Sequence, residues 1–271
     1  MKKQSEQSGR VIEYYRKTAE DYDKEYDTPY WKDLYDKITW HFIQPYLPVD
    51  GLVLDAGGGT GKWAIPIAQR GLRVVIYEIS REMLNVALRK VKELSLESLI
   101  QTKEGDICHV DFPDNHFNFV LAEGDPISYC DDPDMAVAEI YRVLKPGCLV
   151  SAGVDSLFRI VRLVCLSHDL ETALKILSEK RLYMEEAGFH CWLFTPEDLR
   201  ELFVRHGFEV IKIIGKPVVF SKEAEPLLLD VEKAKKLLEI ELMLCEQESI
   251  AGYGGHLHIV ARKPREPHRP I

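Results

Sequence analysis

The stretch that decides the fold is LVLDAGGGTG, residues 52–61. Its first half is an apolar run typical of a buried strand, and its second half holds four glycines. Glycine permits positive φ angles and lets a ligand approach the main chain closely. A helical pattern follows and ends at Gly71, and the first turn of a helix carries unpaired N–H groups. The stretch predicts a strand, a ligand-binding loop and a helix, although these glycines also suit a tight turn without a ligand.

Three kinds of ligand are bound by glycine loops of this type. A phosphate-binding P-loop requires G-x-x-x-x-G-K-[ST], but Ala56 replaces its first glycine and Trp63 its hydroxyl residue. A dinucleotide loop requires G-x-G-x-x-G, and Lys62 stands where its third glycine should be. The pattern that remains is D-x-G-x-G-x-G, from Asp55 to Gly61.

Strands and helices alternate after this loop. Further strands are predicted at 73–78, 100–104, 117–122 and 148–153, and helices at 81–93 and 134–143. Such alternation demands a parallel sheet with helices on both faces. After residue 153 the rhythm changes. Helices are predicted at 156–187, 196–206 and 222–248, and short strands at 208–214 and 256–261.

Acidic residues also stand at or just after the ends of the next three predicted strands. Glu78 ends the second strand, Gly105-Asp106-Ile107 follows the third, and Ala122-Glu123-Gly124-Asp125 follows the fourth. Together with the loop, and with the corner Lys145-Pro146-Gly147, the chain resembles class I S-adenosylmethionine-dependent methyltransferases over about residues 10–153. The resemblance implies a Rossmann-like three-layer α/β/α sandwich. Its mostly parallel seven-stranded sheet would have an antiparallel last strand, with an N-terminal helical lid and a helical insertion.

The resemblance also implies S-adenosyl-L-methionine as the cofactor. Glu78 would accept hydrogen bonds from the ribose diol, Asp106 would bind the adenine amino group, and Ile107 would pack on the adenine ring. The acidic residues also allow readings without a ligand. Asp55 could cap the next helix, Glu78 could be a solvated strand end, and Asp106 suits a turn. The expected cofactor-binding residues of the core are Asp55, Gly57, Gly58, Gly59, Thr60, Gly61, Glu78, Ile79, Asp106, Ile107 and Glu123.

Seven of the twelve tyrosines lie in the first 46 residues. This region resembles the N-terminal lid of small-molecule methyltransferases of the ubiquinone and menaquinone biosynthesis type. Aromatic faces attract cations, so Tyr15, Tyr22 and Tyr30 are expected to contact the sulfonium cofactor. The alternative is ordinary packing, because the 15, 22, 26 spacing also suits one face of a helix.

Methyl transfer from a sulfonium is an in-line displacement, and a base is needed only if the acceptor must first lose a proton. The candidate bases are Asp125, His41 and His190. Trp192 and Phe194 either line an apolar acceptor pocket or belong to the core. No metal site is predicted, because none of the six cysteines forms a Cys-x-x-Cys motif.

The net charge of −9 disfavours a nucleic-acid substrate, because phosphate binding usually requires a basic face. A small or medium-sized organic acceptor is therefore expected. The alternatives are an enzyme acting on tRNA or protein, and a non-catalytic binding module. No apolar run reaches the ~20 residues of a spanning helix, and no signal-like segment begins the chain, so a cytoplasmic location is expected. The sequence does not indicate an oligomeric state.

Four parts are expected along the chain. They are a helical lid at 1–50, the cofactor-binding core at 51–153, a helical insertion that caps the acceptor at 154–195, and the rest of the sheet at 196–271 with a helix at 222–248.

Overall fold

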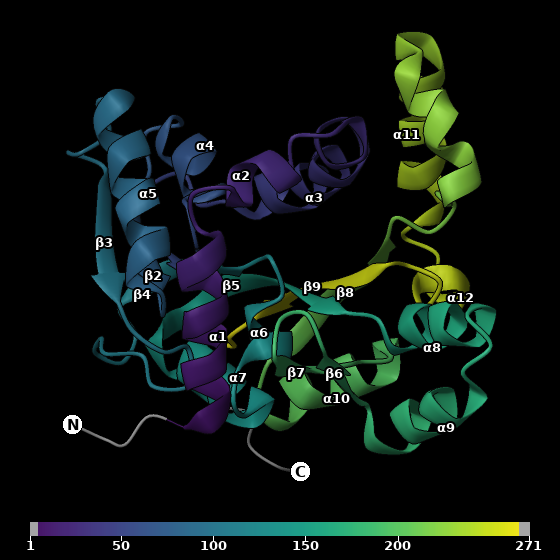
Figure 1. Cartoon of the computed structure of the whole chain (residues 1–271). Helices are drawn as coiled ribbons and strands as arrows, with labels where there is room; N and C mark the ends of the chain where they lie inside the picture. The colour runs from purple at the N-terminus through teal and green to yellow at the C-terminus, as the bar shows by residue number, and fades with distance from the viewer. Residues whose placement is uncertain (1–4, 266–271) are drawn as a thin grey trace.

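A computed structural model describes residues 5–265. Its centre is a seven-stranded sheet in the order β3-β2-β1-β4-β5-β9-β8 (Figure 1). The first five strands of this order are parallel, and β9 is antiparallel to both of its neighbours. The strands are β1 (Leu52–Ala56), β2 (Arg73–Glu78), β3 (Ile100–Glu104), β4 (Phe117–Ala122), β5 (Leu144–Asp155), β8 (Glu209–Lys216) and β9 (His256–Arg262). The predicted fold class is confirmed, including the antiparallel last strand.

Helices cover both faces of the sheet because successive strand residues point to opposite sides. Val53 belongs to the core beneath α4 (Ala64–Ala68) and α5 (Arg81–Glu93). Its neighbour Leu54 belongs to the core beneath α7 (Pro133–Val143) and α10 (Pro196–Arg205). Both side chains are fully buried. The strand is apolar on both faces for this reason, as expected of a parallel sheet between two helical layers.

The order of the strands reverses at β1. From β1 the chain moves outward to β2 and β3, and then returns to β4 on the other side of β1. In open α/β sheets, ligands bind at the carboxyl ends of the strands beside such a switch point. The glycine loop lies at this end of β1 and therefore faces the expected crevice.

The N-terminal region consists of short helices placed over this crevice. They are α1 (Glu6–Thr18), α2 (Tyr22–Glu25), the π-helix η1 (Tyr30–Tyr35), α3 (Asp36–Ile43) and the 3₁₀ turn η2 (Gln44–Tyr46). Ser5 caps α1 by accepting from the Ser8 amide. Ala19 packs with Met83 and Val86 of α5, so the far end of α1 is fixed to the core.

Residues 154–195 are not all helical, which corrects the expected helical insertion. Helices α8 (Leu157–Leu166) and α9 (Leu170–Glu179) are followed by a hairpin of β6 (Arg181–Met184) and β7 (Phe189–Trp192). Lys180 adopts a left-handed conformation that ends α9. Gly188, with φ +78°, lies in the hairpin turn. The helical pattern before residue 180 concealed this turn.

The expected single helix at 222–248 is also wrong. Residues Lys222–Leu229 form the 3₁₀ helix η3, which contains Pro226, and proline is poorly tolerated inside an α-helix. Asp230 then caps α11 (Val231–Leu244), and α12 (Glu248–Ala251) follows. In Figure 1 α11 projects from the body of the molecule, and its apolar side packs with Ile38 and Phe42 of α3.

Within residues 5–265, the helices are all too short or too polar to cross a membrane.

Candidate functional site

A cavity of about 360 Å³ lies at the switch point, between the carboxyl ends of the strands and the N-terminal helices. This size is within the roughly 300–1,000 Å³ of small-molecule sites. Most of the residues expected to act in the site meet here. Those in its wall are Tyr15, Tyr22, Gly57, Gly58, Gly59, Thr60, Glu78, Ile79, Asp106, Ile107, Glu123 and Asp125. Segments up to 110 residues apart in sequence thus form one hollow.

The glycine loop presents its main chain to the cavity. Gly57 and Gly59 have φ angles of +71° and +51°, which side-chain-bearing residues rarely adopt. A Cβ at Gly59 would meet only Met83 Cε, at 3.2 Å. A larger β-branched side chain would both strain the backbone and enter the space beside the loop.

Glu78 ties the end of β2 to this loop. Its Oε2 accepts from the Gly59 amide at 3.1 Å, and its Oε1 accepts from the Ser80 amide at 2.8 Å. Burial raises the pKa of Glu78, although these amides oppose the rise. Glu78 is therefore a fixed carboxylate in the cavity wall and not a solvated strand end.

Asp55 and Gly61 do not line the cavity. The Asp55 side chain is fully buried beneath the loop, and a Cβ at Gly58 would lie 2.8 Å from its carboxyl carbon. Burial raises the pKa of Asp55 to about 7. Asp55 thus supports the loop from below.

Asp106 and Ile107 follow β3 and also lie in the cavity wall. Asp106 Oδ1 accepts from the Cys108 amide at 2.8 Å, which is a turn, and its Oδ2 accepts from the Ser8 hydroxyl at 3.3 Å. The same carboxylate therefore contacts α1 and faces the cavity.

The N-terminal helices contribute a continuous series of aromatic rings. The centroids of Tyr15 and Tyr22 are 6.0 Å apart, and those of Tyr22 and Tyr26 are 4.8 Å apart. Trp31 follows at 4.7 Å from Tyr26, and Tyr35 at 4.7 Å from Trp31. All five line the cavity. Sequence reasoning missed Tyr26, Trp31 and Tyr35.

Tyr30 does not line the cavity. Its ring packs instead on Phe220, with centroids 4.8 Å apart. Tyr30 begins the six-residue π-helix η1, whereas Trp31 and Tyr35 of the same helix line the cavity. Of the three tyrosines expected to contact the cofactor, Tyr15 and Tyr22 therefore line the cavity and Tyr30 does not.

Hydrogen bonds connect helix α2, which carries Tyr22, to the core. Thr60 in the glycine loop donates to Asp23 Oδ1 at 2.6 Å, and Lys90 on α5 contacts Asp23 Oδ2 at 2.8 Å. The N-terminal region is thus held over the loop by groups at the cavity rim.

Glu123 belongs to a buried charge network that the sequence did not reveal. Lys216 Nζ on β8 lies 2.7 Å from Glu123 Oε2 and donates to Thr39 Oγ1 at 2.9 Å. His258 Nδ1 lies 2.8 Å from Glu123 Oε1. Burial opposes ionisation, but Lys216 and His258 hold the pKa of Glu123 at about 2. The network gives Glu123 a fixed negative charge.

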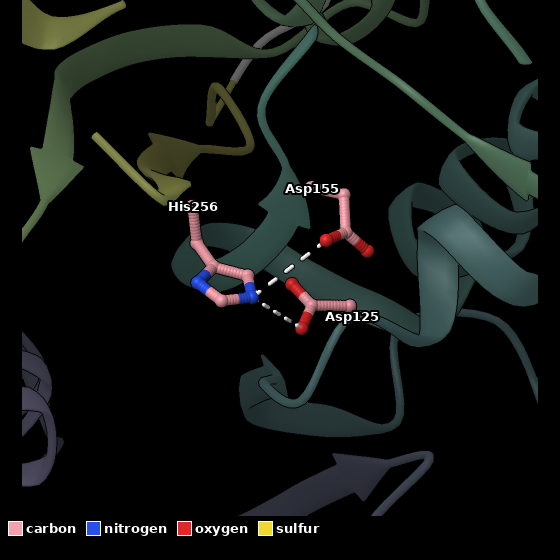
Figure 2. Close-up of side chains that lie close together, drawn as sticks. All are labelled: Asp125, Asp155 and His256. Atoms are coloured by element: carbon pink, nitrogen blue, oxygen red, sulfur yellow. Dashed lines mark ion pairs between the residues drawn. The ribbon is translucent and has the colours of Figure 1, made fainter. Parts of the chain in front are cut away.

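Asp125 is buried and lies next to two partly buried side chains, Asp155 and His256. His256 Nε2 is 3.4 Å from Asp125 Oδ2 and 3.7 Å from Asp155 Oδ1. Dashed lines mark both ion pairs in Figure 2. Burial raises the pKa of Asp125 to about 7 and that of Asp155 to about 6. Asp125 and His256 line the cavity. The sequence indicated only Asp125, because the strands that bring the others lie far along the chain.

The other two candidate bases lie outside the cavity. His41 is exposed on α3. The His190 ring packs on Tyr183, with centroids 5.0 Å apart, and its amide donates to Gln7 Oε1. Trp192 and Phe194 pack in or against the main core and not in the cavity wall. Of the three candidates, only Asp125 is placed to meet a bound molecule.

Residues 53–147 match the family model described as a methyltransferase domain. The matched range begins at β1 and ends after α7, and so includes the glycine loop, Glu78, Asp106 and Asp125. Over this range the chain carries a methyltransferase domain of the class I S-adenosylmethionine-dependent type.

Relatives of this chain differ in the acceptors that their names give. Demethylmenaquinone methyltransferase of Lactiplantibacillus plantarum is 34% identical over 119 residues, which are 41% of this chain and 50% of the relative. The tRNA 5-carboxymethoxyuridine methyltransferase of Escherichia coli is 24% identical over 221 residues, 79% of this chain and 80% of the relative. The alignment with the first relative thus spans half of that protein's length.

A solved structure gives the fold over nearly the whole chain. It is a Thermotoga maritima protein described as a S-adenosylmethionine-dependent methyltransferase, possible histamine N-methyltransferase. Its TM-score is 0.61 at 19% identity, and the match covers 93% of this chain and 99% of that one. At this identity the likeness establishes the fold alone.

Proposed function

We propose that this protein transfers a methyl group from S-adenosylmethionine to a small or medium-sized organic acceptor. The observation that carries the proposal is the cavity at the switch point, which is lined by bare glycine main chain, by Glu78 and by a series of aromatic rings. Residues 1–50 would act as the lid and 51–153 as the cofactor-binding core. The rest of the chain would complete the acceptor side.

The residues present fit the cofactor. Glu78 presents a fixed carboxylate to which a ribose diol can donate, as in dinucleotide folds. Asp106 and Ile107 offer a hydrogen-bond acceptor and an apolar surface in the cavity wall for a purine. The rings from Tyr15 to Tyr35 suit a sulfonium cation, since aromatic faces attract cations.

When bound, S-adenosylmethionine supplies a methyl group on a sulfonium, which is already an activated electrophile. The protein's own part is therefore to hold the acceptor in line and to exclude water. Alignment of this kind can contribute ~7–11 kcal/mol. The bonds from Asp23 to Thr60 and Lys90 would keep the lid closed. Asp125 is the group in place to take a proton from an acceptor that must lose one.

Calorimetric titration with S-adenosylhomocysteine tests the proposal. We expect one site per chain and heat at micromolar ligand. Glu104→Gln, an exposed acid at the end of the next strand, should bind the ligand as the wild type does. A protein that gives no heat at millimolar ligand would be a non-catalytic module on this fold.

A tRNA acceptor is the second candidate, because the E. coli tRNA methyltransferase is similar over 80% of its own length. The net charge of −9 favours the small acceptor, since a nucleic-acid backbone requires basic partners. Filter binding with bulk tRNA at several salt concentrations distinguishes the two. Tight, salt-sensitive retention would replace the small acceptor with tRNA.

We also propose a cytoplasmic location. Cys108, Cys130 and Cys191 are buried free thiols, and such thiols are typical of reducing compartments.

A further inference from the structure

Three strands bring Asp125, Asp155 and His256 together beside the cavity, and Asp125 and His256 line it. Asp125 follows β4, Asp155 ends β5, and His256 begins β9. Asp155 and His256 are direct partners in the antiparallel register of β5 and β9, so the sheet itself fixes their separation. One ligand-type atom from each of the three residues lies within 4.8 Å of the others.

The polar atoms of this cluster face one another without completing hydrogen bonds. The distances from His256 Nε2 to the two carboxylates, 3.4 and 3.7 Å, are longer than good hydrogen bonds. Asp125 Oδ1 is buried and lacks a hydrogen-bond partner among residues 5–265. In Figure 2 the Asp125 and Asp155 carboxylates turn oxygens toward each other. Such an arrangement is costly unless a cation lies between the groups.

The nearest buried cation is already engaged. Lys216 Nζ contacts Glu123 and Thr39 at 2.7 and 2.9 Å. The second oxygen of Asp155 accepts from Cys191 Sγ at 3.2 Å, which adds no charge. The buried Asp125 carboxylate and the partly buried Asp155 carboxylate therefore share one imidazole as their immediate counter-group.

We propose that Asp125, Asp155 and His256 bind a divalent first-row transition metal ion, of the Mn²⁺ or Zn²⁺ kind, in the cavity wall. One imidazole nitrogen and two carboxylate oxygens suit these ions. An ion about 2.1 Å from each ligand holds neighbouring ligand atoms roughly 3–3.5 Å apart, close to the observed 3.4 and 3.7 Å. Its two charges would neutralise the two carboxylates.

The position of the cluster gives the ion a use. Asp125 and His256 line the cavity, so the remaining coordination positions would face the acceptor. An acceptor oxygen could occupy one of them. This use rests on the proposed function, whereas binding of the ion does not.

Electron paramagnetic resonance of Mn²⁺ tests the site on the full chain after treatment with a chelator. When Mn²⁺ is added to the protein, the six-line signal of free Mn²⁺ should stay absent until one equivalent of Mn²⁺ per chain has been added. Asp155→Asn, which keeps the side-chain size, should weaken binding at least tenfold, and His256→Gln should do the same. Asp114→Asn removes a surface carboxylate that pairs with Arg142 and should leave binding unchanged. Thermal melts show which variants are folded.

Two results would overturn the metal site. One is a wild-type protein that leaves the Mn²⁺ signal unchanged and also gives no calorimetric heat with Zn²⁺. The other is equal affinity in the wild type and in folded Asp155→Asn and His256→Gln. Titration with S-adenosylhomocysteine on the same samples separates the two proposals. Cofactor binding without Mn²⁺ or Zn²⁺ binding rejects only the metal site, and metal binding without cofactor binding rejects only the methyltransferase function.

Discussion

The two halves of the cavity are built in different ways. The half formed by the glycine loop comes from one short stretch, residues 57–60, and from the end of the adjacent strand at Glu78. The other half combines Tyr35, Asp125 and His256 from three distant segments. The first half presents main chain and a carboxylate held by amides, whereas the second presents side chains whose charges are incompletely paired. A site made from backbone can be encoded locally, but a site made from side chains depends on tertiary register.

The largest expected effect is a loss of stability when the buried network of Glu123, Lys216 and His258 is broken on the side-chain half of the cavity. Lys216→Met removes the cation that pairs with Glu123. The buried Glu123 carboxylate then keeps His258 as its one ion-pair partner among residues 5–265. Breaking a buried pair in this way typically costs about 3–5 kcal/mol of unfolding free energy. Chemical denaturation measures it. Lys212→Met, on the same strand but paired at the surface with Glu246, should cost less than about 1 kcal/mol. A similar loss of unfolding free energy in Lys216→Met and Lys212→Met would contradict the claim that the buried network stabilises the fold.

Acidification should weaken the same network gradually. The folded-state pKa of Glu123 is about 2, below its ordinary value of 4.5. Its contribution to stability is therefore complete above pH 4.5 and is lost as the pH falls toward 2. Denaturation curves of wild type and Glu123→Gln between pH 6 and pH 3 measure this. The difference between them should shrink toward low pH, and a difference independent of pH would refute the lowered pKa.

Gly59→Val tests the backbone half. The residue has φ +51°, and a β-branched side chain would strain the loop and fill the space beside it. Cofactor affinity should fall at least about 100-fold, or about 2.7 kcal/mol, in a protein that still folds. Gly188→Val carries similar strain, with φ +78°, in the hairpin turn away from the cavity. It should bind cofactor normally. Unchanged affinity in Gly59→Val would reject the loop assignment.

Glu78→Ala should have a smaller effect on the same half. Loss of hydrogen bonds to a charged group costs roughly 1–3 kcal/mol of binding free energy. Calorimetry with S-adenosylhomocysteine measures it, with Glu104→Ala as the exposed strand-end control. If the two variants bind equally well, the ribose lies elsewhere.

The smallest effect concerns the lid that covers both halves. Asp23→Ala removes the contacts with Thr60 and Lys90 at the rim. Exposed pairs contribute less than about 1 kcal/mol, so cofactor dissociation in stopped flow should accelerate by a few-fold. Asp21→Ala, whose partner Lys24 is local, should leave the rate unchanged. Equal rates in the two variants would show that this contact does not hold the lid.

The contrast between the halves also explains what the sequence could predict. Strand β1, its loop and α5 follow from apolar periodicity, glycine spacing and the Ser80 cap. The hairpin β6–β7 and the break at Pro226 interrupt segments whose composition is otherwise helical.

The acceptor side could not be predicted from local pattern. Asp155 and His256 are 101 positions apart in the sequence and meet only through the register of β5 with β9. Lys216 reaches Glu123 from the edge strand of the sheet. Tyr30 was chosen for its aromatic chemistry, but its ring packs on Phe220 from the distant segment after β8. His41 and His190 were chosen for chemistry alone, and no neighbouring residue indicated which way they face.

A crystal structure of the chain with S-adenosylhomocysteine tests the central claim most directly. The nucleoside should lie against the main chain at 57–59, with both ribose hydroxyls within hydrogen-bond distance of Glu78 and the sulfur facing the rings of Tyr15 to Tyr35. A nucleoside bound in another cleft, or a loop that stays covered by side chains while the ligand is bound, would contradict it.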